Sequence, residues 1–262
     1  MRILVNKICI AFSSLLLVNV CCGQDESTLL KLNSFQLDAG INQLKEENLH
    51  PKVHGGAVFG LLYSNLRTKS NHKQFDIGIQ FSRLKTEYES LAATMNIQLF
   101  ANYAYLFNGI TNDKFTYNIG PEFGLHYNLS LYPNWDESHL YWADYLCLGL
   151  RNKLKYQLNE KQALTVDLSI PVFSLISRPE LNRMYKIDNI SAGGIINSMH
   201  SNLKGALWNH SFIIKSRIEY CFKINNRIKQ AICYSLNYSR LMEKKGLPFQ
   251  NLQHLIGLKI YY

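Results

Sequence analysis

Residues 115–131 read FTYNIGPEFGLHYNLSL, and apolar and polar side chains alternate along almost the whole stretch. Apolar residues take odd positions from Phe115 to Leu131, while small or polar residues take the even positions. A period of two is typical of a β-strand with one apolar and one polar face. Strands of soluble proteins mostly have about 3–10 residues, so this length favours the wall of a barrel over a sandwich.

The same alternation recurs along the rest of the chain and predicts nine further strands. These segments are residues 33–45, 53–66, 75–82, 91–107, 139–157, 164–172, 212–222, 232–239 and 250–262. Beyond the N-terminal region no apolar run reaches about 18 residues, so the sequence predicts no transmembrane helix. A chain of 262 residues without an evident linker is expected to form one all-β domain.

The last predicted strand is apolar on one face and ends on an aromatic residue. Ile256, Leu258, Ile260 and Tyr262 share that face. The segment resembles the closing strand of bacterial outer-membrane β-barrels, and the chain resembles the small barrels of unknown function in Gram-negative outer membranes. The resemblance implies an up-and-down antiparallel transmembrane β-barrel of about 10 strands, with 8 or 12 as alternatives. A secreted β-sandwich is the competing fold.

Lipid explains why one face of each strand is apolar and the other polar. Backbone groups in hydrocarbon must be paired, so a sheet has to close, with an apolar outside and a polar inside. The charged or ionisable residues on the polar faces are therefore expected to form a polar network in the lumen: Asp76, Glu122, His126, Asp167, Lys215, Arg217 and Glu219. Because a barrel of this size is narrow, Lys215, Arg217, Glu122 and Asp167 are expected to plug it with ion pairs.

The N-terminal residues have the layout of a secretory signal peptide. Arg2 and Lys7 precede an apolar stretch over residues 8–20, and the small residues Cys21-Cys22-Gly23 follow. We expect cleavage after Gly23, which divides the chain into a signal peptide (1–23) and an outer-membrane barrel (24–262). A retained N-terminal anchor is the alternative.

The chain is basic, with 28 Lys and Arg against 19 Asp and Glu, and remains so without Arg2 and Lys7. The charges are scattered and the chain is predicted to be exported, so nucleic acid is not an expected partner. The expected partners are outer-membrane lipids and lipopolysaccharide, with a small solute or a partner membrane protein as further candidates. The histidines lack a paired Cys/His spacing, so no metal and no cofactor is expected.

Short and long connections alternate along the chain, as in an up-and-down barrel. Turns are expected near residues 69–73, 108–114, 159–161 and 225–227, and loops near residues 45–52, 87–90, 133–138, 178–205 and 243–248. With an even strand count both termini would lie in the periplasm, and 133–138 and 178–205 would be extracellular. Aromatic residues near strand ends, including Tyr132, Tyr141 and Trp142, are expected to form girdles at the membrane interfaces.

One predicted outer loop places carboxylates close to a histidine. Asp136, Glu137 and His139 are candidates for activating a water molecule at the barrel rim. Such a protein resembles the omptin proteases in architecture alone, because no omptin motif maps onto these residues. The favoured function is a non-enzymatic barrel of unassigned specificity, for solute or ligand binding, as a transport accessory or in a structural role. The alternative is a rim hydrolase, protease-like or lipase-like.

Three cysteines remain after the expected cleavage, at positions 147, 221 and 233. Cys221 and Cys233 flank one predicted hairpin and have the same inward parity. A cross-strand disulfide and two free thiols are both compatible with this spacing, because the strand register is not readable from the sequence.

Overall fold

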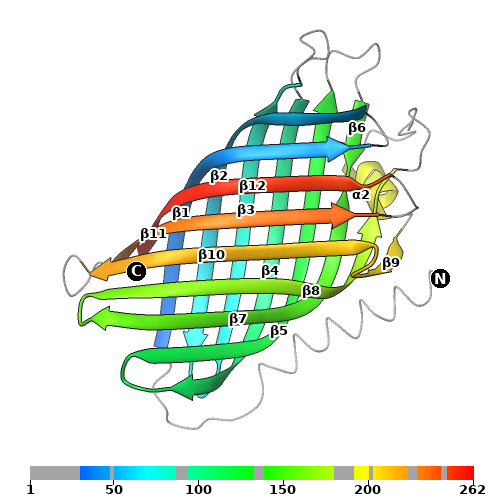
Figure 1. The fold of residues 1–262 in the computed structure, drawn as a ribbon. Coiled ribbons are helices and arrows are strands. Elements are labelled where there is room, and N and C mark those ends of the chain that lie inside the picture. The colour runs from blue at the N-terminus through cyan, green and yellow to red at the C-terminus, as the bar shows by residue number, and fades with distance from the viewer. Residues whose placement is uncertain are drawn as a thin grey trace.

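The computed structural model is a closed antiparallel β-barrel (Figure 1). It describes residues 30–47, 50–86, 94–132, 139–179, 192–200, 203–223, 229–242 and 247–262. The expected signal peptide lies outside these residues.

Ten long strands form the barrel wall, and they match the ten predicted segments. They are β1 (Leu30–Glu46), β2 (His50–Thr68), β3 (His72–Leu84), β4 (Thr94–Thr111), β5 (Phe115–Tyr132), β7 (Asp144–Asn159), β8 (Gln162–Ser177), β10 (Ser211–Lys223), β11 (Lys229–Leu241) and β12 (Phe249–Tyr261). Each pairs with the next in this order, and β12 pairs with β1 without a break from Ser34↔Tyr261 to Glu46↔Phe249. The ten-stranded antiparallel barrel predicted from the sequence is confirmed.

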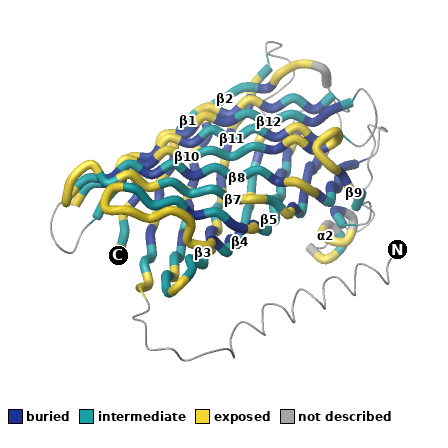
Figure 2. Tube along the Cα trace, turned by 60° about the horizontal axis from the view of Figure 1, so that its bottom comes forward, coloured by how far each residue is buried: buried dark blue, intermediate teal, exposed yellow. Residues whose placement is uncertain are grey.

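Strand parity separates an apolar outside from a polar inside, as β3 illustrates. Phe75, Ile77, Ile79 and Phe81 are exposed on the outer face, whereas the residues between them are mostly buried inside (Figure 2). The flanking outward residues are Lys73 and Arg83. Ten residues span roughly 33 Å along a strand, or about 25 Å across a membrane at the usual tilt. The two flanking charges are therefore separated by about the height of the apolar band of an outer-membrane barrel.

The predicted strand 139–157 is interrupted. A short strand β6 (His139–Trp142) and β7 both pair with β5, and the break falls at Ala143. There the Asp144 carboxylate accepts a hydrogen bond from the Asn128 backbone N–H at 3.0 Å. The side chain thus satisfies a donor that the interrupted ladder leaves unpaired.

The sequence predicts a loop over residues 178–205, but part of this segment has regular secondary structure. They contain the helix α2 (Ala192–His200) and the start of β9 (Lys204–Leu207), which pairs with β8. α2 lies on the outer side of the wall, where the His200 ring contacts the hydroxyl of outward-facing Tyr127 at 3.0 Å. No helix in the described part of the chain is long and apolar enough to cross a membrane.

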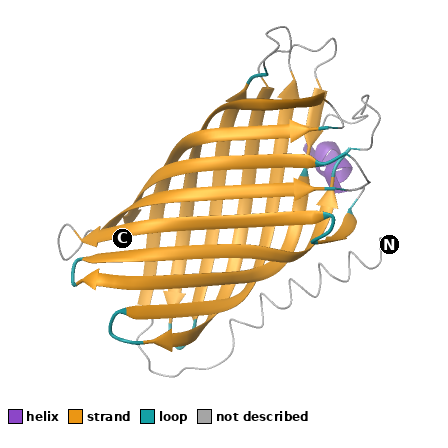
Figure 3. Ribbon diagram, in the orientation of Figure 1, coloured by secondary structure: helices purple, strands orange, loops and turns teal. Residues whose placement is uncertain are grey.

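The two rims of the barrel differ in their connections. One rim, here called the turn rim, carries the tight connections 69–71, 112–114 and 160–161. Register places Leu30 opposite Thr68 and Ser34 opposite Tyr261, so both ends of the described barrel also lie there (Figure 3). The opposite rim, the loop rim, carries α2 and β9 together with the other long connections.

The outer belt predicts how stability depends on depth in the membrane. Leu236 lies on the outer face in the middle of β11, and Gln230 lies on the same face near the turn rim. Leu236→Arg should destabilise the barrel in lipid vesicles by about 2–4 kcal/mol, and Gln230→Arg by at most about 1 kcal/mol. Reversible unfolding by denaturant in vesicles measures both; equal costs would contradict an outer face immersed in hydrocarbon.

Candidate functional site

The lumen is the candidate site because it gathers the buried charges of the described chain. Between the rims, five carboxylates and five cations point inward, and all are buried or half-buried. They are Asp38, Asp76, Glu122, Asp167, Glu219, Arg151, Lys153, Lys215, Arg217 and Lys259. The interior is therefore neutral overall when all ten are ionised, which suits a poorly solvated space.

Arg151 of β7 is the centre of this network. Its Nε and Nη2 donate to the two carboxylate oxygens of Asp167 on β8, at 2.8 and 2.6 Å. Its Nη1 donates to Asp76 of β3 at 2.8 Å, and Glu122 of β5 lies 3.7 Å from its Nε. Gln74 donates to both oxygens of Asp76 at 3.0 Å. Because β3 and β7 are not neighbours, the guanidinium group bridges the lumen.

A second network lies closer to the turn rim. Lys259 of β12 donates to Glu219 of β10 at 2.8 Å, and the Tyr261 hydroxyl donates to the other carboxylate oxygen at 2.8 Å. Arg217 is 3.8 Å from the same carboxylate. These bonds join β10 to β12 across β11, so they tie side chains that backbone pairing does not bring together.

A small cavity remains on the loop-rim side of Arg151. It measures about 100 Å³, and Lys215 and His126 line it. The His126 ring lies between the rings of Phe100 and Tyr145, and its Nε2 contacts Lys215 Nζ at 2.5 Å and Asn102 Oδ1 at 2.9 Å. Ligand pockets usually measure about 300–1,000 Å³, whereas this volume suits a few water molecules.

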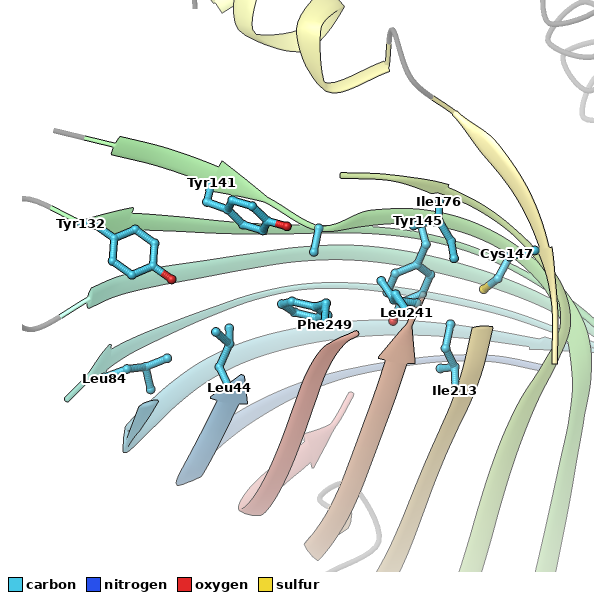
Figure 4. Packing of buried hydrophobic residues seen from close by; sticks show 12 residues of the cluster. Leu44, Leu84, Tyr132, Tyr141, Tyr145, Cys147, Ile176, Ile213, Leu241 and Phe249 are labelled. Atoms are coloured by element: carbon cyan, nitrogen blue, oxygen red, sulfur yellow. The ribbon is translucent and has the colours of Figure 1, made fainter. Parts of the chain in front are cut away.

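An apolar layer fills the barrel mouth at the loop rim. Figure 4 shows its side chains pointing from the strand ends toward one another: Leu44, Leu84, Tyr132, Tyr141, Tyr145, Cys147, Ile176, Ile213, Leu241 and Phe249. The expectation that Tyr132 and Tyr141 lie in an outer aromatic girdle is wrong, because both point into the mouth. Trp142 is also buried, at 1% exposure, and donates to the Ser177 hydroxyl.

Arg178 connects the segments around this apolar layer through an ion pair and hydrogen bonds. Its side chain is fully buried and pairs with the carboxylate of Glu46, at the end of β1, at 2.5 Å. Its Nη1 donates to the backbone carbonyls of Leu241 and Leu247 at 3.0 and 3.2 Å. Tyr141 accepts a further bond from its Nε. One residue thus links four segments of the mouth.

The seven residues expected in the lumen all have inward parity in the structure. Asp76, Glu122 and Asp167 surround Arg151, Glu219 lies beside Arg217, and Lys215 contacts His126. Among the described residues, neither Lys215 nor Arg217 forms an ion pair with Glu122 or Asp167. The ion pairs in this part of the lumen therefore centre on Arg151, which the sequence did not predict.

The structure also bears on the predicted cysteine pair, the rim candidates and metal binding. Cys221 and Cys233 are free buried thiols, and they lie in diagonal register, opposite Ala231 and Glu219 respectively. The candidates Asp136 and Glu137 lie outside the described residues, and His139 is described only by its backbone pairing with Tyr132. Within the described ranges, no group of three His, Cys, Asp or Glu side chains is arranged to hold a metal.

Fold and interior together define a closed ten-stranded β-barrel with an apolar outer belt and a polar lumen whose charges balance. No protein-family model and no curated protein matches the sequence. Similar solved structures include the translocator domain of the autotransporter NalP from Neisseria meningitidis (7% identity, 97% of this chain and 95% of that chain covered, TM-score 0.45). Another is the outer membrane protease OmpT from Escherichia coli (6%, 91% and 98%, TM-score 0.49). Likenesses this distant carry no argument about activity.

The Arg151 network predicts that removing one charge lowers the free energy of unfolding much more than replacing all of the paired charges together. Arg151→Met should destabilise the barrel by about 3–5 kcal/mol, because Asp76 and Asp167 would be left buried without their cation. Adding Asp76→Asn and Asp167→Asn to this variant should recover much of the loss. Denaturant unfolding in detergent measures the free energies; a single variant as stable as the wild type would show that Arg151 is not the centre of the network.

Proposed function

We propose that the chain is an integral outer-membrane β-barrel that does not conduct solutes and has a structural or transport-accessory role. The observation that carries the proposal is Arg151, whose guanidinium group bridges β3 and β7 and crosses the lumen. The apolar layer and Arg178 form a second obstruction at the loop rim. On this proposal, the two obstructions in series close the polar path along the barrel axis.

The outer belt supports insertion in a membrane, and the predicted signal peptide supports export. Exposed apolar side chains occupy the outer face of every long strand, as in Leu37 on β1 and Leu258 on β12. In water such a continuous surface would be far larger than the apolar patches that soluble monomers tolerate. A closed barrel with this belt is the β-structure that lipid permits.

We place the turn rim in the periplasm and the loop rim outside the cell. Barrels of this class carry short turns on the periplasmic side and longer connections on the outer side. The turn rim has the tight connections, whereas the loop rim bears α2 and β9. The barrel's interactions with partners would then take place at its rims and lipid-facing wall, because the 100 Å³ cavity is too small for most solutes.

Conductance tests the closed lumen directly. In planar bilayers the wild type should show no steady channel steps. A mouth variant, Arg178→Ala/Phe249→Ala, should also stay closed because Arg151 still crosses the lumen below it. Adding Arg151→Ala should produce measurable conductance. Wild-type steps that persist after repurification would contradict the proposal.

Heat modifiability tests the membrane barrel independently of conductance. The protein should be found in the outer-membrane fraction, and unboiled samples should migrate differently from boiled ones in detergent gels. Its accessibility to an external protease should be confined to loop-rim segments. Recovery as a soluble periplasmic protein without a mobility shift would rule out the membrane assignment.

A further inference from the structure

Among the described residues, the excess of positive over negative side chains is larger at the turn rim than at the loop rim. Nine Lys and Arg side chains of the described chain lie at or near the turn rim, against the two carboxylates of Asp113 and Glu160. The nine are Lys31, Arg67, Lys69, Lys73, Lys114, Lys155, Lys161, Lys223 and Lys229. The ten charges inside the barrel balance one another, so within the described part of the chain this rim accounts for most of the excess.

Three of these cations stand side by side on the lipid-facing wall. Register places Lys31 of β1 directly opposite Arg67 of β2, and Arg67 directly opposite Lys73 of β3. Lys31 and Arg67 are exposed and Lys73 is half-buried, and all three have the outward parity of the apolar belt. We call Lys31, Arg67 and Lys73 the basic stripe.

Like charges in this register are unfavourable without a counter-ion. Side chains directly opposite on paired strands have Cβ atoms about 4.5–5.5 Å apart, and like charges there destabilise a sheet. Among the described residues, none of the three has a carboxylate within 4.0 Å. The repulsion is relieved when an anion bridges the stripe.

The surroundings of the stripe hold it at the edge of the apolar belt. Asn65 accepts a hydrogen bond from Arg67 Nε at 3.1 Å, and Asn65 in turn donates to Asn33 at 2.6 Å. The Lys73 ammonium lies 5.7 Å from the centre of the Tyr105 ring. The next outward side chain on β3 is Phe75, which begins the belt. Cations beside an aromatic ring at this depth are placed at the level of lipid headgroups.

We infer that the basic stripe is a binding site for the phosphodiester headgroup of an anionic phospholipid in the leaflet at the turn rim. The inference rests on the proposed membrane barrel and adds a ligand class and a site to it. Its position favours phospholipid over lipopolysaccharide, because the stripe lies at the rim opposite the long connections. Arg67 is central, since it faces both lysines and its guanidinium group can donate two bonds to one phosphate.

Native mass spectrometry of the purified barrel tests the site. The protein is offered equal amounts of phosphatidylglycerol, phosphatidylethanolamine and lipid A in a neutral detergent. The wild type should retain phosphatidylglycerol over phosphatidylethanolamine by at least about fivefold, the factor expected from one surface cation. Lys31→Gln/Arg67→Gln/Lys73→Gln should retain the two lipids almost equally.

A matched variant separates the site from net charge. Lys155→Gln/Lys223→Gln/Lys229→Gln removes three turn-rim cations whose parity is lumenal, and it should keep the wild-type preference. Phosphatidylglycerol should raise the thermal unfolding midpoint of the wild type but not of the stripe variant. The gel mobility shift establishes folding for each protein; if the triple variant does not fold, Arg67→Gln replaces it.

Three outcomes would overturn the site. They are a stripe variant that retains phosphatidylglycerol as the wild type does, a lumenal variant that loses it equally, and a wild type that prefers lipid A. None of them depends on conductance or on cell fractionation. A failed lipid site is therefore distinguishable from a failed proposal of a closed outer-membrane barrel.

Discussion

The rest of the structure depends on the pairing of every backbone N–H and C=O group of a sheet that faces hydrocarbon. An open edge would leave a row of unpaired groups with no water to solvate them. The pairing of β12 with β1 removes that edge, and the pairing of β8 with β10 closes the wall across the 178–205 insert. Once the wall is closed, strand parity alone decides which side chains meet lipid and which face the lumen.

Closure also determines what the interior can contain. Ten strands enclose a space that side chains can fill, so inward charges meet one another more than they meet water. An unpaired charge there carries a large desolvation free energy. The five inward carboxylates and five inward cations offset this cost because they are equal in number and opposite in sign. Arg151 pairs with carboxylates of two different strands at once. The same contacts that make the charges tolerable hold the Arg151 side chain between β3 and β8 inside the barrel.

The sequence predicted the wall better than the contents of the barrel. Alternation identified ten strands and the parity of residues such as Asp76 and Glu219, because period two follows from strand geometry. Arg151 was missed because it lies in the weakly alternating segment 139–157, which the structure interrupts at Ala143. Its contact with Asp76 joins residues 75 positions apart in the sequence. Whether these two side chains meet depends on the radius of the barrel and on how far successive strands are shifted along one another. Neither quantity is encoded in any single segment.

The distribution of charge clarifies what the basic composition means. A net charge of +9 invites an explanation by an anionic solute in the lumen. The structure argues against it, because the lumenal charges neutralise one another and most of the remaining excess among the described residues lies at the turn rim. Lys31, Arg67 and Lys73 oppose one another across strands where alternating signs would cost less. A membrane surface is the extended anionic phase that this rim would meet in the proposed orientation, so we interpret the excess charge as an adaptation to lipid headgroups.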